Sequence, residues 1–159
     1  MNLKLNEIER KIWIDFHAFA YKDDLKLAQR VLNEHPRWAI IVAYYAMHNI
    51  AKLYLGKIHN IKVSSPEIHK QTIREVNRFI NDADERKRVV SLLEKAEEEI
   101  KNLQPEHIPY LLAIGKRERG KAQYYSGRLL SKIDYSKKAH WFVEKIAKVF
   151  IKTMQSLVE

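Results

Sequence analysis

The stretch from residue 115 to residue 128 concentrates side chains that can bind phosphate. Three of the chain's four glycines interrupt it, at Gly115, Gly120 and Gly127, and glycine breaks the helical pattern of the flanking sequence. Its basic and aromatic residues are Lys116, Arg117, Arg119, Lys121, Tyr124, Tyr125 and Arg128. Because cations contact phosphates and tyrosine rings stack on bases, this composition predicts a surface that binds nucleic acid or nucleotide. The alternative interpretation is a solvated basic loop between two helices.

The charge balance supports an anionic partner. The chain of 159 residues has 29 Lys and Arg against 20 Asp and Glu, a formal net charge of +9. Residues 116–138 hold eight basic and two acidic residues, so most of the excess lies in this segment. Nucleic acid is the commonest anionic partner of such a protein, and an acidic protein or an anionic membrane surface is the alternative.

Histidines in the first half of the chain form a second group of candidates. His48 lies four residues after Tyr44 and four residues before Lys52, so the three side chains share one face of a helix. A histidine at the edge of the core, satisfied by a hydrogen bond, has the same pattern. His69 follows Pro66 in the first turn of a predicted helix, where local packing or capping is the alternative to catalysis.

An Arg-x4-His pair occurs once, at Arg30 and His35. Arginine can stabilise charge that develops on phosphorus while histidine moves the 2′-hydroxyl proton, so the pair suits RNA cleavage. A chance match is the alternative. The chain lacks cysteine and has no His-Glu-x-x-His motif or phosphate-binding glycine loop, so the sequence predicts no metal site and no cofactor.

Apolar periodicity predicts a single domain, residues 1–159, that is an all-α bundle of four to five helices. The predicted helices cover residues 5–32 (one long helix or two collinear helices), 37–55, 66–81, 82 or 84 to 103, and 136–157, with no convincing strand. The signals at their ends are a capping box at Asn6 and Glu9, Gly56 as a stop, a second capping box at Ser64 and Glu67, Asp82 or Asp84 as a cap, and Pro105 and Pro109 as stops.

The pattern within the helices predicts how they pack. An apolar stripe on the first helix is predicted from residues that recur at spacings of three and four: Ile8, Ile12, Phe16, Phe19 and Ala20. The second helix is apolar on nearly every side between residues 38 and 47, which is typical of a central, buried helix. The acidic run at residues 94–99 is most simply a solvated face. Core or dimer-interface positions are predicted for Trp13, Trp38 and Trp141, and packing positions for Tyr44, Tyr45 and Tyr54.

The localisation is predicted from two absences. The N-terminus has no uninterrupted apolar run of the kind found in signal peptides. The longest mostly apolar run, residues 38–47, is far shorter than the ~20 residues that cross a bilayer. We therefore expect a soluble, cytoplasmic protein with no membrane partner.

Three segments resemble the HEPN family of small helical proteins. Residues 43–55 read AYYAMHNIAKLYL and residues 62–69 read KVSSPEIH, which is similar to that family's second helix, the turn after it and the histidine that begins the next helix. Residues 119–124, RGKAQY, are similar to the Arg-x-x-Ala-Asp-Tyr segment that some members carry before their last helix.

This resemblance implies a helical bundle, often a homodimer, associated with RNA cleavage, toxin–antitoxin systems, RNA-directed defence or a small nucleotidyltransferase partner. Members that are ribonucleases carry Arg followed after four to six residues by His. Here Tyr124 stands at that distance from Arg119, and Gln123 replaces the Asp of the other variant. The expected catalytic set is Arg119 on phosphate, Tyr124 as a stacking or hydroxyl group, and His48 or His69 completing the site across a dimer.

The predicted function is therefore a HEPN-like protein that binds nucleic acid or nucleotide. A metal-independent ribonuclease and a non-catalytic partner of a nucleotidyltransferase are the alternatives. We expect RNA or nucleotide as the ligand and a second copy of the chain as the protein partner.

Overall fold

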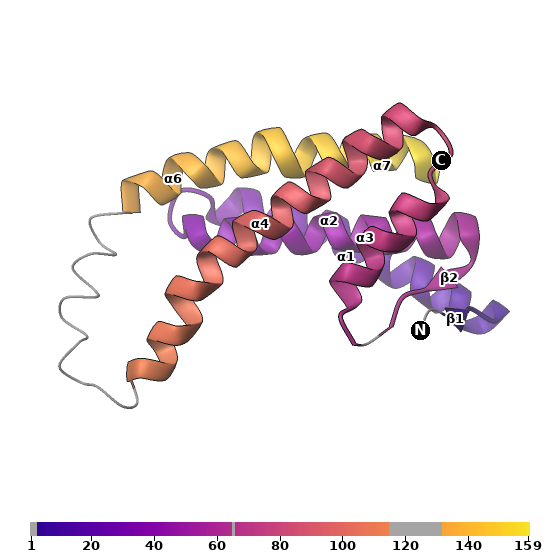
Figure 1. Ribbon diagram of the computed structural model, residues 1–159, viewed down its shortest axis with the longest axis horizontal. Coiled ribbons are helices and arrows are strands. Elements are labelled where there is room, and N and C mark those ends of the chain that lie inside the picture. Colours follow the sequence, from indigo (N-terminus) through magenta and orange to yellow (C-terminus); the bar gives the residue numbers. More distant parts are fainter. Residues whose placement is uncertain (1–2, 65, 115–131) are drawn as a thin grey trace.

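The computed structural model describes residues 3–64, 66–114 and 132–159, with side chains described outside 104–114 and 132–134. The described chain is an all-α bundle, as the sequence predicts (Figure 1). Its elements are β1 (Leu3–Lys4), α1 (Glu7–Val31), α2 (Pro36–His59), β2 (Ile61–Lys62), α3 (Ile68–Phe79), α4 (Ala83–Ile114), α6 (Lys132–Trp141), the π-helical segment η2 (Phe142–Ala147) and α7 (Lys148–Val158).

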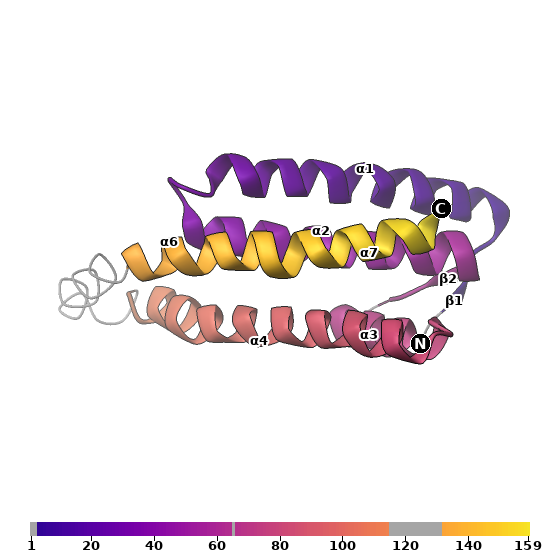
Figure 2. The ribbon, with the colours of Figure 1, turned by 90° about the horizontal axis from the view of Figure 1, so that it is seen from above.

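The helices form three layers (Figure 2). One outer layer is α1, the middle layer holds α2 beside the continuous rod of α6, η2 and α7, and the other outer layer holds α3 and α4. The middle layer supplies the largest fully buried side chains, including Ile40 and Met47 from α2 and Phe142 and Phe150 from the C-terminal rod. The predicted central position of the second helix is thereby confirmed.

Two helix starts follow the predicted capping chemistry. The Asn6 side chain accepts a hydrogen bond from the Glu9 amide at 2.9 Å, and the Glu9 carboxylate accepts one from the Asn6 amide at 3.3 Å. These bonds satisfy two donors at the open end of α1, which is a single helix. At the start of α4, the Asp82 carboxylate accepts a hydrogen bond from the Glu85 amide at 2.8 Å.

Gly56 does not end the second helix, contrary to the prediction. The helix continues to His59 and closes at Asn60, whose backbone is left-handed with φ 56°. Gly56 is instead buried where α2 packs against α1, and a Cβ atom there would overlap the Trp13 ring. The Trp13 indole also donates a hydrogen bond to the Lys52 carbonyl at 2.9 Å. Close helix approach, rather than termination, requires this glycine.

Three further boundaries differ from the prediction. Ser64 and Glu67 do not form a capping box, because Glu67 itself precedes α3 with a left-handed backbone and caps nothing with its side chain. The backbone of α4 passes through Pro105 and Pro109 to Ile114, so neither proline ends the helix although each removes an intrahelical donor. A two-residue antiparallel bridge pairs β1 with β2, with Leu3 opposite residue 62, where no strand was expected.

The apolar stripe of α1 points away from the bundle. Ile8, Ile12, Phe16 and Phe19 are 76, 65, 61 and 68% exposed, whereas Tyr21 on the inner face is buried. Contiguous apolar patches of this kind are rare on monomeric proteins and mark interaction surfaces.

The aromatic residues divide between the core and the surface. Tyr44 and Tyr54 are buried as predicted, but Tyr45 is half exposed. Trp38 and Trp141 are also exposed to solvent, so neither ring is a core residue. For these two rings, the dimer interface remains as the predicted alternative. Among the described helices, none combines the length and the apolarity needed to cross a membrane.

Candidate functional site

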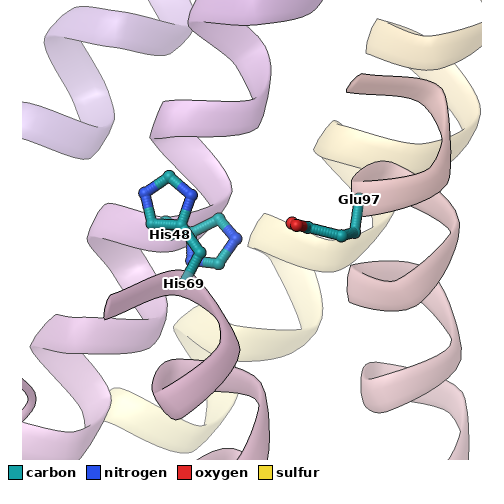
Figure 3. A group of neighbouring side chains, drawn as sticks. All are labelled: His48, His69 and Glu97. Atoms are coloured by element: carbon teal, nitrogen blue, oxygen red, sulfur yellow. The ribbon is translucent and has the colours of Figure 1, made fainter. Parts of the chain in front are cut away.

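Four polar side chains from three helices meet on one side of α2. Tyr44 and His48 come from α2, His69 comes from the first turn of α3, and Glu97 comes from the middle of α4. Figure 3 shows the two imidazole rings side by side, with Glu97 extending toward them from the facing helix. Lys52 lies one turn beyond His48, on the helix face that the sequence predicted for it. We call Tyr44, His48, His69 and Glu97 the polar cluster.

A hydrogen-bonded chain connects three members of the cluster. The Tyr44 hydroxyl donates to the Glu97 carboxylate, and Nδ1 of His69 lies 2.8 Å from the same hydroxyl oxygen. Since the only proton of that hydroxyl is directed to Glu97, Nδ1 of His69 must carry a proton and donate it. In a neutral ring, Nε2 of His69 then keeps its lone pair, so the arrangement fixes the tautomer.

His48 is completely buried, and neither ring nitrogen has a hydrogen-bond partner among the described residues. Its ring stacks on His69 with centroids 4.2 Å apart and an interplanar angle of 22°, and meets Tyr44 edge-on at 4.6 Å. A buried polar group without a partner costs roughly 1–3 kcal/mol. His48 is therefore not the satisfied core histidine of the simpler interpretation.

The surroundings of the polar cluster favour the neutral form of both imidazole rings. Burial holds the pKa of His48 well below its usual value, and the nearby His69 and Lys52 lower it further. Burial also lowers the pKa of His69, as does Lys52, while the Glu97 carboxylate acts in the opposite direction. Burial lowers the pKa of Lys52 and, together with Glu97, raises that of the Tyr44 hydroxyl. Near neutral pH both imidazoles are neutral and the phenol keeps its proton.

A groove of about 610 Å³ opens onto the cluster from the surface. Its lining residues are Glu67, Ile68, His69, Lys70, Ile73, Glu97 and Lys101. His69 and Glu97 thus face a solvent-filled space, while His48 lies behind them in the protein interior. Lys70 and Lys101 bring two cations to the groove, and Lys70 is ion-paired with Glu67 of the same lining, with N and O 3.7 Å apart.

The structure brings together two of the predicted site residues, His48 and His69. It also joins them to Tyr44, which was expected only to pack. The remaining predicted catalytic and binding residues lie outside the described part of the chain: Arg119, Tyr124, Lys116, Arg117, Lys121, Tyr125 and Arg128.

The Arg30–His35 pair lies apart from the cluster. Both side chains are exposed at the turn between α1 and α2. With a rise of 1.5 Å per residue, His35 is separated from His48 by about 20 Å along α2. This pair does not share a site with the polar cluster.

Glu97 is the member of the cluster that sequence reasoning missed. The acidic run at residues 94–99 is not uniformly solvated, because Glu97 is half-buried and Glu99 is buried beside Lys138, with N and O 2.9 Å apart. The signal was its register: Glu97 lies four residues after the buried Leu93 and three before the buried Ile100. That spacing places Glu97 at the edge of the buried face of α4.

Comparison of the chain with protein-family models, curated proteins and solved structures gives no match. The HEPN resemblance therefore rests on the three quoted segments. Tyr44, His48, Lys52 and His69 all fall within two of them, residues 43–55 and 62–69.

Proposed function

We propose that this protein is a cytoplasmic, HEPN-like protein that binds nucleic acid or nucleotide. The observation that carries the proposal is the groove in which His69 and Glu97 stand beside Lys70 and Lys101, in a chain of net charge +9. The Lys101 ammonium can attract phosphate, whereas Lys70 pairs with Glu67 of the same groove. The neutral imidazole of His69 and the Glu97 carboxylate can hydrogen-bond a ribose or a base. The basic segment at residues 116–128 supplies further cations and stacking rings.

The binding proposal is tested with a fluorescent single-stranded RNA titrated over a range of salt concentrations. Joint replacement of Arg119 and Arg128 by Ala should weaken binding and reduce the slope of log K against log salt by about 1.4, the share of two phosphate contacts on a single strand. The control replaces Lys22 and Lys26, two exposed lysines of α1, by Ala. Equal affinity and slope in the Arg119/Arg128 variant and the wild type would refute the assignment.

Ribonuclease activity without a metal is a second candidate, favoured by the fixed tautomer of His69. In this reaction Nε2 of His69 accepts the 2′-hydroxyl proton and the 2′-oxygen bonds to phosphorus. The bond from phosphorus to the 5′-oxygen breaks, and the 5′-oxygen takes a proton from the solvent. Arg119 stabilises the charge on the phosphoryl oxygens. Cleavage of labelled RNA in EDTA should disappear in His69→Gln and in Arg119→Ala, and cleavage retained by His69→Gln would remove this mechanism.

We also propose that two copies of the chain pair through the exposed stripe of α1. Ile8, Ile12, Phe16 and Phe19 occupy one continuous face, and a two-fold axis across it would bury the same patch on both copies. A stable complex with a small nucleotidyltransferase, together with negligible RNA affinity at physiological salt, would instead assign the basic surface to a protein partner.

A further inference from the structure

The donor atoms of His48, His69 and Glu97 are arranged like a set of metal ligands. One imidazole nitrogen from each histidine and one carboxylate oxygen all lie within 4.8 Å of one another, and Figure 3 shows the three side chains converging from α2, α3 and α4. A tetrahedral Zn²⁺ with bonds of about 2.1 Å requires donors roughly 3.4 Å apart. Side-chain rotations that shorten these separations by at most about 1.4 Å would close the site.

We propose that His48, His69 and Glu97 bind a Zn²⁺ ion, with a fourth coordination position open toward the groove. Two histidines and one glutamate are a donor set found in zinc sites that keep a water or substrate in the remaining position. This site does not depend on the binding of nucleic acid. The zinc site and the metal-independent ribonuclease are mutually exclusive, because both require the lone pair on Nε2 of His69.

His48 supplies the independent reason for a ligand. Its side chain is fully buried and neither nitrogen has a hydrogen-bond partner among the described residues. A coordinated metal would use one of these lone pairs and remove part of the cost of burying the ring.

His69 is already oriented as a metal-binding histidine. Such histidines donate their second ring N–H to a hydrogen-bond acceptor, which fixes the ring and increases its basicity. Here Nδ1 of His69 donates to Tyr44, and Tyr44 donates to Glu97. Nε2 of His69 is then the nitrogen available to the metal. Tyr44 supports two of the proposed ligands and is not a ligand itself, because its raised pKa keeps the phenol protonated.

Charge and access both bear on affinity. The Glu97 carboxylate attracts a cation, while Lys52, which lowers the pKa of both histidines, opposes one. The neutral Lys52→Met variant should therefore bind the ion more tightly than the wild type. The groove reaches His69 and Glu97 from solvent, so the ion has an entry path.

The test is calorimetric titration of Zn²⁺ into EDTA-treated, dialysed full-length protein. We expect one tight site per chain. Glu97→Gln and His69→Ala should each weaken it more than about 100-fold, since changes to supporting residues alone cost 10–100-fold. Exposed residues of the same types provide the controls: Glu94→Gln on the same helix and His140→Gln should bind like the wild type.

Cobalt provides a reading that does not depend on any variant. Co²⁺ bound by two imidazoles, a carboxylate and water should give the visible absorption of a four-coordinate ion, and Zn²⁺ should displace it. The proposal is overturned if the wild type shows neither stoichiometric Zn²⁺ binding nor this Co²⁺ spectrum. It is also overturned if folded Glu97→Gln and His69→Ala bind as tightly as the controls.

Discussion

Replacing His48 by Leu should change protein stability in opposite directions without and with zinc. Without metal, the substitution removes two buried ring nitrogens that have no hydrogen-bond partner among the described residues, each worth roughly 1–3 kcal/mol. It also removes ring contacts with His69 and Tyr44, worth about 0.5–1.5 kcal/mol each. With the middle of each range, the two nitrogens cost about 4 kcal/mol and the two ring contacts contribute about 2 kcal/mol. The His48→Leu protein should therefore be about 2 kcal/mol more stable than the wild type. In a chain of this length, that raises Tm by roughly 4–8 °C.

Zinc should reverse this order. A ligand present at 1,000 times its Kd stabilises the folded state by about 4 kcal/mol, and the variant forgoes nearly all of it because it lacks a ligand. Wild type should then be the more stable protein by about 2 kcal/mol, the difference between these two estimates.

Urea unfolding followed by circular dichroism, in EDTA and in zinc, measures both effects. Met47→Leu is the control, because Met47 is the adjacent, fully buried residue of α2 and a swap of similar volume costs less than about 1.5 kcal/mol. That variant should keep the full zinc response. A His48→Leu protein that is less stable than wild type in EDTA would show that the nitrogens are satisfied in solution. One that keeps the zinc response would show that His48 is not a ligand.

Three further perturbations test the helix packing, the pH dependence of stability and the pairing of two copies. Gly56→Ala should lower the free energy of unfolding by about 2 kcal/mol in urea titrations, although Ala favours helices, because its Cβ atom meets the Trp13 ring; an unchanged midpoint would contradict the close approach. Burial lowers the pKa of His17 from 6.5 to about 4, so the unfolded chain binds more protons in this window. The contribution of His17 to the free energy of unfolding should be fully present above pH 6.5 and decrease toward pH 4, so the urea midpoint should fall less steeply with decreasing pH in His17→Gln than in the wild type. The same pH dependence of the urea midpoint in both proteins would count against this. The double substitution Phe16→Glu and Phe19→Glu should convert the dimer to a monomer in sedimentation velocity. A wild-type protein that sediments as a monomer would contradict the proposal that two copies pair through the stripe of α1.

Local signals were sufficient to predict most helix positions. The Asn6–Glu9 capping box, the Asp82 cap and the all-round apolar middle of α2 involve residues close in sequence, so short-range chemistry determines them. The shared face of Tyr44, His48 and Lys52 was predictable for the same reason.

The rest of the site depends on contacts between distant segments. The sequence near Glu97 does not predict that this residue faces His69, because the rotation of one packed helix relative to another depends on their whole interface. The role of Gly56 was hidden in the same way, since Trp13 lies on another helix. The stripe of α1 had the pattern of a core face, but the inner face of α1 uses a different set, including the buried Tyr21 and Ala28.

¹⁵N NMR of the histidine rings during a zinc titration distinguishes a ligand-binding centre at His48 and His69 from a structural contact. Among the seven histidines, we expect only these two to change their ring nitrogen shifts, together and up to one equivalent. Glu97→Gln should prevent the change. Shifts that leave both rings unaltered while exposed histidines respond would contradict the ligand-binding centre.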